Sequence, residues 1–153
     1  MIRIEQSDRS NNPYAAVFSL ASQAYKSEDL IPQVILKHWW QQHPSLFYLA
    51  FEGETLCGYM SAFPVTREAF KKTLEPDFDE KKLEPTSIIN FDAKGEYQMY
   101  FSSIVVHPSW RGQGVSNALR EDFLNNLLLL WGQGSWVTQL SSIVIVVSPK
   151  VPL

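Results

Sequence analysis

The chain has 153 residues and a mass of 17.5 kDa, and 45% of its residues are hydrophobic, which fits a single domain spanning residues 1–153. Its 16 acidic residues outnumber its 13 basic ones, and the net charge of -3 disfavours a protein that binds nucleic acid over a wide surface. The single cysteine, Cys57, excludes an internal disulfide, and with three scattered histidines no metal site is expected.

The hydropathy pattern predicts where in the cell the protein is located. The apolar runs at 127–131 and 143–147 are far shorter than the ~18 residues that a membrane-spanning helix needs. Residues 1–30 lack the basic start and apolar block of a secretory signal. We therefore expect a cytoplasmic protein with no membrane partner.

Two helices are expected after a short strand at residues 2–5. Asn12-Pro13 is typical of a helix start, with asparagine as the cap and proline in the first turn, and this helix would run to about residue 25. A second helix is expected over residues 32–42. Its apolar stripe consists of Val34, Ile35, Trp39 and Trp40. The tryptophan pair would either line an acceptor pocket or pack in the core, and core packing is favoured.

A hairpin and an insertion follow. Strands at 46–52 and 56–65 flank a short turn that contains glycine, which is the pattern of a β-hairpin. A short helix at 67–74 leads into an irregular segment at 75–95, and loops of this length are often functional. By its position, the insertion at 66–95 is expected to determine specificity. Asp77, Asp79 and Glu80 would attract a cationic amine, although neighbouring lysines offset that field and a solvated loop is the more ordinary interpretation.

The last third predicts a strand, a helix and a strand. A long strand is expected over 96–106, with the odd-numbered residues Tyr97, Met99, Phe101, Ser103 and Val105 on one face. The helix would run to about residue 131. Its buried face would comprise Val115, Leu119, Phe123, Leu127 and Leu130. The run at 140–147, which is apolar throughout from Ile143 to Val147, is typical of a buried parallel strand.

The segment between that long strand and that helix carries the chemistry. It reads Arg111-Gly112-Gln113-Gly114-Val115-Ser116. The first turn of a helix has unpaired N–H groups and positive potential, glycines let an anion approach closely, and arginine adds a charged fork. The pattern therefore predicts a phosphate site, although the letters alone fit a plain helix start equally well. The segment lacks the Gly-Lys-Ser/Thr ending of a nucleotide P-loop and the third glycine of a dinucleotide fingerprint.

In its wider context this segment resembles motif A of the GNAT superfamily of N-acetyltransferases, Arg/Gln-x-x-Gly-x-Gly/Ala, with Ser116 in place of the usual glycine or alanine. The order of the expected elements also resembles that family from residue 1 to about 147. The resemblance implies a mixed α+β fold with a mostly antiparallel central sheet flanked by helices. The family's last helix and strand pair would be missing.

The resemblance also implies acetyl-CoA as co-substrate. Main-chain groups of Ile104, Val105 and Val106 would bond the pantetheine arm, where the long strand and the last strand splay apart. The residues expected at the pyrophosphate are Gly112, Gln113, Gly114, Val115 and Ser116 through their N–H groups, and Arg111 along its edge. The acetyl group would pass directly to a primary amine of a small molecule or peptide, with a main-chain N–H near Val105 or Val106 stabilising the oxyanion.

Candidates for the catalytic base are Glu96 and Tyr100, acting through water. The ordinary interpretations also stay open: a solvated charge at the start of the strand for Glu96, and packing for Tyr100. His107 is expected to serve the turn, and Cys57 to be a small core residue.

Three functions remain open at this point: an N-acetyltransferase, a non-catalytic acyl-CoA-binding module or truncated pseudoenzyme of the same fold, and an unrelated phosphate-binding protein. Because a bare apolar edge strand invites association, we expect a homo-oligomer that covers the strand at 140–147.

Overall fold

A computed structural model describes residues 1–91, 95–132 and 140–151. These residues contain a five-stranded sheet in the order β1-β2-β3-β4-β5. Neighbouring strands from β1 to β4 are antiparallel, whereas β5 runs parallel to β4. The strands are β1 (Arg3–Gln6), β2 (Phe47–Glu52), β3 (Thr55–Val65), β4 (Gly95–Val106) and β5 (Leu140–Val147). The predicted mixed, mostly antiparallel sheet is confirmed.

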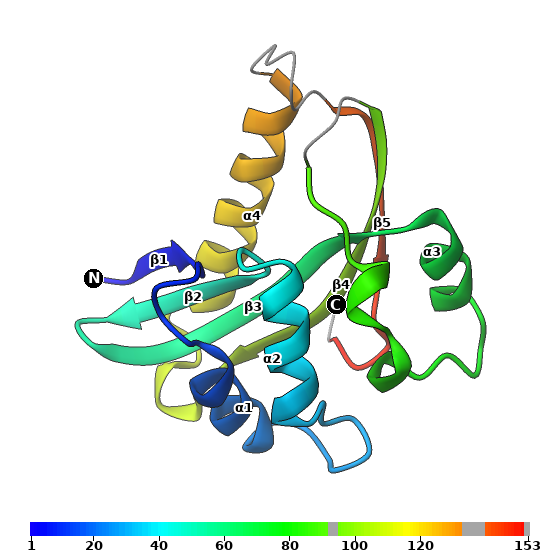
Figure 1. Cartoon of the computed structure of the whole chain (residues 1–153). Coiled ribbons are helices and arrows are strands. Elements are labelled where there is room, and N and C mark those ends of the chain that lie inside the picture. The colour runs from blue at the N-terminus through cyan, green and yellow to red at the C-terminus, as the bar shows by residue number, and fades with distance from the viewer. Residues whose placement is uncertain (92–94, 133–139, 152–153) are drawn as a thin grey trace.

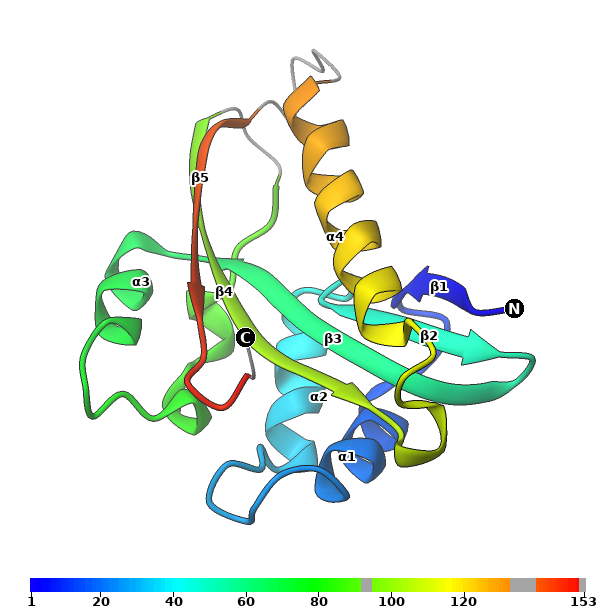
Figure 2. The ribbon, with the colours of Figure 1, turned by 180° about the vertical axis from the view of Figure 1, so that it is seen from behind.

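Helices cover both faces of this sheet. Helices α1 (Tyr14–Ser22) and α2 (Gln33–Gln42) pack on one face, and α4 (Val115–Gly132) packs on the other (Figures 1 and 2). Helix α3 (Arg67–Thr73) follows β3. The segment expected to be irregular contains two short 3-10 helices, η1 (Glu80–Lys82) and η2 (Pro85–Ser87), and a third, η3 (Pro108–Trp110), follows β4. Each face of the sheet thus has its own hydrophobic core.

The N-terminal cap of α1 and the buried face of α2 differ from the prediction. Pro13, not Asn12, takes the cap position of α1, and its carbonyl accepts a hydrogen bond from the Val17 N–H at 3.0 Å. In α2 the buried residues are Leu36, Trp39 and Trp40, while Val34 is 57% exposed. The helix turns about 100° per residue, so burying positions 36, 39 and 40 necessarily rotates position 34 outward.

The tryptophans of α2 belong to the core, as favoured by the sequence. The Trp39 indole N–H donates to the Leu83 carbonyl at 2.8 Å, and the Trp40 indole N–H donates to the Asp8 carbonyl at 3.1 Å. Because Leu83 follows η1, the Trp39 bond fixes the insertion against the core. Cys57 is also fully buried, as expected.

A β-bulge divides β4 into two halves. Ser61 of β3 lies opposite Ser103, but the next residue of β3, Ala62, lies opposite Phe101, so Ser102 is an extra residue in β4. A bulge of this kind disrupts the ladder locally and re-aims the side chains that follow it.

The bulge overturns the expected alternation of β4. Met99 and Phe101 pack in the core beneath α4, and beyond the bulge it is Ile104 that joins them. Val105 packs instead with Tyr100 on the face of α1 and α2. The prediction that all odd-numbered residues share one face is therefore wrong past Ser102, because the extra residue shifts the two-residue period by one.

Strand β5 pairs only with the first half of β4. Their paired positions run from Gly95–Leu140 to Phe101–Val147, and the Ser148 N–H then donates to the Phe101 carbonyl at 2.8 Å. From Ser103 to Val106, β4 pairs with β3 alone among the described residues. The strands thus separate, as the family resemblance implied, and β5 is the last regular element in the described part of the chain.

Helix α4 packs through its expected face. Val115, Leu119, Phe123 and Leu127 are buried, while the side chain of Leu130 lies outside the described residues. Within the ranges that the structure describes, no helix combines the length and the apolar character needed to cross a membrane.

Candidate functional site

The turn between β4 and α4 adopts the backbone conformation that its glycines predict. Gly112 and Gly114 have φ angles of 77° and 81°, in the left-handed region where a side chain is strained. The Gly114 carbonyl accepts the first helical bond of α4, from the Ala118 N–H at 3.0 Å. His107 serves the turn, as expected, because its Nδ1 accepts a hydrogen bond from the Ser109 N–H at 3.1 Å. Directly after this turn come the N–H groups of the first turn of α4, which lack partners within the helix.

Gly58 of β3 holds this turn against the sheet. A Cβ atom there would lie 2.9 Å from Val115 Cγ1 and 3.0 Å from the Val105 carbonyl oxygen. Glycine is therefore what allows the start of α4 to approach the end of β4 so closely. We did not single out this residue from the sequence, where a glycine inside a strand is the signal of a close approach.

A cavity of about 480 Å³ opens beside the second half of β4, and we call it the cationic cavity. Arg111, Arg120 and Lys150 line it, and the described part of the chain contributes no carboxylate to the lining. The described residues that line it are Ala24, Tyr25, Ile104, Val105, Val106, Arg111, Ser116, Arg120, Pro149, Lys150 and Val151. An open space with two arginines and the main chain of an unpaired strand edge suits an extended anionic ligand.

The structure brings together some of the residues expected to bind the cofactor. Ile104, Val105, Val106, Arg111 and Ser116 all line the cationic cavity. The side chains of Ile104 and Val105 are buried, so these residues present mainly their backbone, as the resemblance implied.

The other expected residues are not part of the cavity lining. Gly112, Gln113, Gly114 and Val115 form the turn above it. The Gln113 side chain bonds the Ser109 carbonyl at 3.3 Å, and Val115 is buried in the core.

A second cavity, of about 260 Å³, meets the first at Pro149 and Lys150, and we call it the acidic cavity. Its carboxylates come from Glu28, Asp29, Asp79 and Glu80. Its remaining lining residues are Phe78, Lys81, Tyr100, Ser148, Pro149 and Lys150. Two cavities of opposite charge therefore adjoin where β5 leaves β4.

Glu80 is the centre of the polar contacts at this junction. Its Oε2 accepts hydrogen bonds from the Tyr100 hydroxyl at 2.7 Å and from the Ser102 hydroxyl at 3.2 Å, so it contacts the bulge itself. Its Oε1 forms an ion pair with Lys150 Nζ. The side chains of Glu80 and Lys150 are only 11% and 7% exposed, so this pair is shielded from water.

Tyr100 is held as a hydrogen-bond donor. Burial, and next the nearby charge of Glu80, raise the pKa of Tyr100 above its ordinary value of 10.0. Its phenol therefore keeps its proton at neutral pH and donates a hydrogen bond to the carboxylate of Glu80.

The two predicted catalytic residues lie in different places. Tyr100 lines the acidic cavity. Glu96 is exposed at the other end of β4, opposite Ser142 of β5, and lines neither cavity. Glu80 and Lys150 were missed as site residues. Glu80 stood only as one member of an acidic run, and no signal in the sequence pointed to Lys150.

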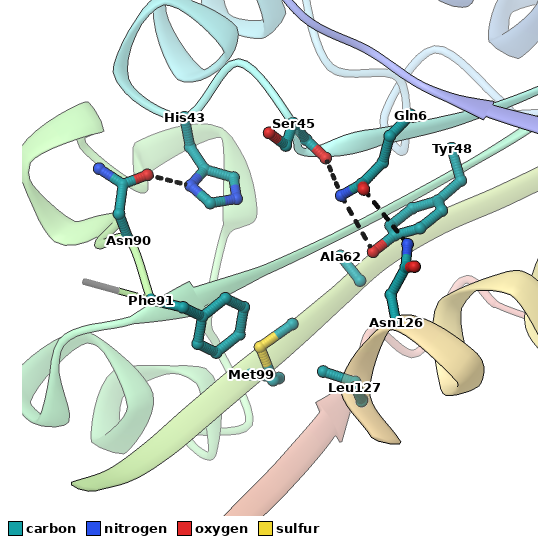
Figure 3. Close-up of a pocket in the computed structure, with 10 residues that line it drawn as sticks. All are labelled: Gln6, His43, Ser45, Tyr48, Ala62, Asn90, Phe91, Met99, Asn126 and Leu127. Atoms are coloured by element: carbon teal, nitrogen blue, oxygen red, sulfur yellow. Dashed lines mark hydrogen bonds between the residues drawn. The ribbon is translucent and has the colours of Figure 1, made fainter. Parts of the chain in front are cut away.

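A further cavity, of about 420 Å³, lies on the face of α4 (Figure 3). Its polar groups bond one another: His43 Nδ1 donates to Asn90, and Asn126 donates to Gln6 at 3.2 Å. The Gln6 amide in turn donates to the Tyr48 hydroxyl at 3.2 Å. Among the described residues, neither lysine nor arginine lines it. It therefore suits an anionic cofactor less well than the cationic cavity.

Comparison with known proteins identifies the family. The model of the acetyltransferase (GNAT) family matches residues 14–125, which include β4, the glycine turn and the start of α4. The chain belongs to the GNAT acetyltransferase family. No curated protein matches the chain in sequence.

Solved structures share this fold at low sequence identity. The loading GNATL domain of CurA from Lyngbya majuscula has a TM-score of 0.63 at 10% identity, with 93% of this chain and 64% of that one covered. The GphF GNAT-like decarboxylase in complex with isobutyryl-CoA has a TM-score of 0.61 at 14% identity, with 80% and 57% covered. The aminoglycoside N-acetyltransferase AAC(6')-Iy in complex with CoA has a TM-score of 0.55 at 13% identity, with 98% and 79% covered. The chain thus spans less than two thirds of the length of the first two.

Proposed function

We propose that the protein transfers the acetyl group of acetyl-CoA directly to a primary amine. The observation that carries this proposal is the junction of a cationic and an acidic cavity at the bulge of β4, with Glu80 and Lys150 between them. An acyl transfer of this kind needs one site for an anionic donor, one for a cationic acceptor, and a proton acceptor at their meeting point, for which a carboxylate is suited.

The cationic cavity is the proposed site for acetyl-CoA. The pantetheine arm would lie along Ile104, Val105 and Val106, where β4 has no partner strand on its outer side in the described structure. The diphosphate would lie at the N–H groups of Gly112 to Ser116, at the positive end of α4. Arg111, whose Nε donates to the Val106 carbonyl at 3.4 Å, is placed to turn toward it.

The acidic cavity is the proposed site for the amine. A primary amine is a cation at neutral pH, and the carboxylates of Glu28, Asp29, Asp79 and Glu80 favour a cation there. Among the solved structures with this fold, one binds a Gag peptide and another is an aminoglycoside acetyltransferase, so both a peptide and a small-molecule acceptor stay compatible with this proposal.

Glu80 rather than Glu96 is the proposed base. Its carboxylate would take a proton from the acceptor ammonium, and the neutral nitrogen would attack the thioester carbonyl. The C–S bond breaks, an amide forms, and the CoA thiolate leaves and takes up a proton. Tyr100 orients the carboxylate by its hydrogen bond, and a main-chain N–H near Val105 or Val106 would stabilise the oxyanion.

One observation favours a second function, a non-catalytic acyl-CoA-binding module. Glu80 is already paired with Lys150, so an acceptor amine must displace that cation before it reaches the carboxylate. A protein in which Lys150 never moves would bind acetyl-CoA without using it.

Calorimetry and a thiol assay together distinguish these functions. We expect the full chain to bind acetyl-CoA and CoA but not ATP, and to release free thiol from acetyl-CoA faster when primary amines are added. Binding without amine-dependent thiol release would favour the non-catalytic module. Equal binding of ATP and CoA would contradict both.

We also propose that a second copy of the chain covers the outer edge of β5. In the described structure β5 pairs with β4 on one side and with no strand on the other. An apolar strand with an open edge associates readily. Light scattering at micromolar concentration is expected to give a mass above 17.5 kDa, and a monomer would contradict this.

A further inference from the structure

Lys150 occupies the position at which an acceptor ammonium would be recognised. Besides its ion pair with Glu80, its Nζ donates to the Asp29 carbonyl at 3.2 Å and lies 5.0 Å from the centre of the Tyr25 ring. A carboxylate, a carbonyl and an aromatic face are the groups that bind a primary ammonium. Lys150 also lines both cavities, so it stands between the two proposed substrates.

The chain places Lys150 there by crossing the gap that opens between β4 and β5. Ser148 still bonds Phe101 of β4, and the Val151 N–H closes a turn onto the Ser148 carbonyl at 3.0 Å. Val151 is buried in the core beneath α4, whereas Lys150 reaches Glu80 on the opposite face. The lysine is thus fixed at both ends of this turn.

We propose that Lys150 is itself an acceptor, and that the protein acetylates its Nζ in cis. This inference rests on the proposed function, since it uses the same donor site and the same carboxylate. Lys150 has the chemistry of the acceptor class, a primary alkylamine, and it is held at the junction in advance. The usual entropic cost of bringing an acceptor to the donor is therefore already met.

The step balances with the groups present and acetyl-CoA. Glu80 Oε1 accepts one proton from the Lys150 ammonium, and the free electron pair of the nitrogen attacks the thioester carbonyl carbon. The C–S bond breaks as the C–N bond of the amide forms. The CoA thiolate leaves with the electron pair of the C–S bond and takes up the second proton lost by the nitrogen.

Acetylation would change the junction. The acetylated side chain has no positive charge, so its ion pair with Glu80 is lost. The carboxylate then becomes available to an ammonium that enters the acidic cavity. Self-acetylation would therefore prepare the site for an external amine.

Mass spectrometry of the full chain after incubation with acetyl-CoA tests the proposal. Trypsin cleaves after Lys150 only when that residue is unmodified, and the preceding basic residue is Arg120. Acetylation therefore produces the peptide 121–153 with one acetyl group in place of the peptide 121–150. Lys71 and Lys72, which are exposed on α3, report the spontaneous reaction in the same sample.

We expect Lys150 to be acetylated about 100-fold faster than Lys71 and Lys72, at a rate that saturates with acetyl-CoA and does not change with protein concentration. Glu80→Gln should slow this reaction about 100-fold without weakening acetyl-CoA binding, while Glu75→Gln, an exposed carboxylate nearby, should leave it unchanged.

Modification of Lys150 no faster than that of the exposed lysines would overturn the inference, as would a rate that rises with protein concentration. If acetyl-CoA binds and external amines are acetylated while Lys150 stays unmodified, only this inference fails. If acetyl-CoA does not bind, the proposed function fails together with it.

Discussion

The two halves of β4 differ although they belong to one strand. From Gln98 to Phe101 the strand is paired with both β3 and β5, and from Gly95 to Tyr97 it is paired with β5. From Ser103 to Val106 it pairs with β3 but has no partner on its other edge in the described structure. The first half therefore builds the sheet, and the second half offers main-chain groups to a ligand.

The bulge at Ser102 is what separates these roles. It coincides with the residue at which β5 departs, and Tyr100, Ser102 and Ser103 on the two sides of it lie on the same face, where they meet Glu80 and Tyr25. A single extra residue thus separates the half of the strand that pairs with β5 from the half that we propose to bind acetyl-CoA. Changes at residues 103–106 should affect acetyl-CoA binding, and changes at residues 95–99 should affect stability.

The largest effect is expected from the double variant Arg111→Ala, Gly114→Glu. It removes a cation from the cavity, places a carboxylate at the proposed diphosphate and strains a backbone with φ of 81°. We expect acetyl-CoA affinity to fall at least about 100-fold by calorimetry, since an anion site is replaced by a repulsive one.

The matched control for that variant is Arg67→Ala, Gly53→Glu. Gly53 also has a positive φ, of 58°, with open space around it, and Arg67 is exposed on α3. This control should bind acetyl-CoA as the wild type does. Unchanged binding in the Arg111 and Gly114 variant would remove the basis for the proposed site.

Glu80→Gln separates binding from transfer. We expect acetyl-CoA affinity to stay the same and the rate of amine-dependent thiol release to fall by about 100-fold, because general base catalysis typically contributes 10²–10⁴. Glu75→Gln, in an exposed position of the same insertion, should have no effect. If Glu80→Gln keeps the full rate, the base lies elsewhere.

Gly58→Ala probes the contact between the second half of β4 and α4. The new methyl group would meet Val115 Cγ1 at 2.9 Å, so we expect a loss of about 1–3 kcal/mol of unfolding free energy and weaker acetyl-CoA binding. Adding Val115→Ala removes that atom and should recover part of both losses in a double-mutant cycle. Strict additivity of the two changes would argue against this contact.

The smallest effect concerns the segment that leads into the first half of β4. His43 donates to Asn90 there, and burial holds the pKa of His43 below its ordinary value of 6.5. As the pH falls below about 6.5, the unfolded chain takes up a proton that the folded chain does not, so the free energy of unfolding decreases. Urea unfolding of His43→Gln should lack this component, whereas the exposed His38→Gln should retain it. Acetyl-CoA binding should be unaffected by either change at pH 7.5.

The sequence predicted the elements well where local patterns decide them. The hairpin, the strand at 140–147 and the buried face of α4 from Val115 to Leu127 follow from alternation, turn residues and helical spacing. The glycine turn was predicted because Gly112 and Gly114 have a specific conformational use. These features depend on neighbours in the sequence.

The bulge and the contacts of the candidate site could not be predicted in this way, because they depend on residues that lie far apart in the sequence. The bulge at Ser102 arises from pairing with β3, which the alternation within β4 does not reveal. Glu80 meets Tyr100 only because the insertion folds back, fixed by the bond from Trp39 to Leu83. Lys150 joins them from a third segment. Proposing Glu96 as the base from its position in the strand could not take these contacts into account.

Hydrogen–deuterium exchange with and without acetyl-CoA tests the division of β4 most directly. We expect acetyl-CoA to slow exchange at the amides of residues 104–106 and 112–116 while those of 96–101 keep their rates. Protection confined to 96–101, or to the cavity around His43, would contradict the proposed site.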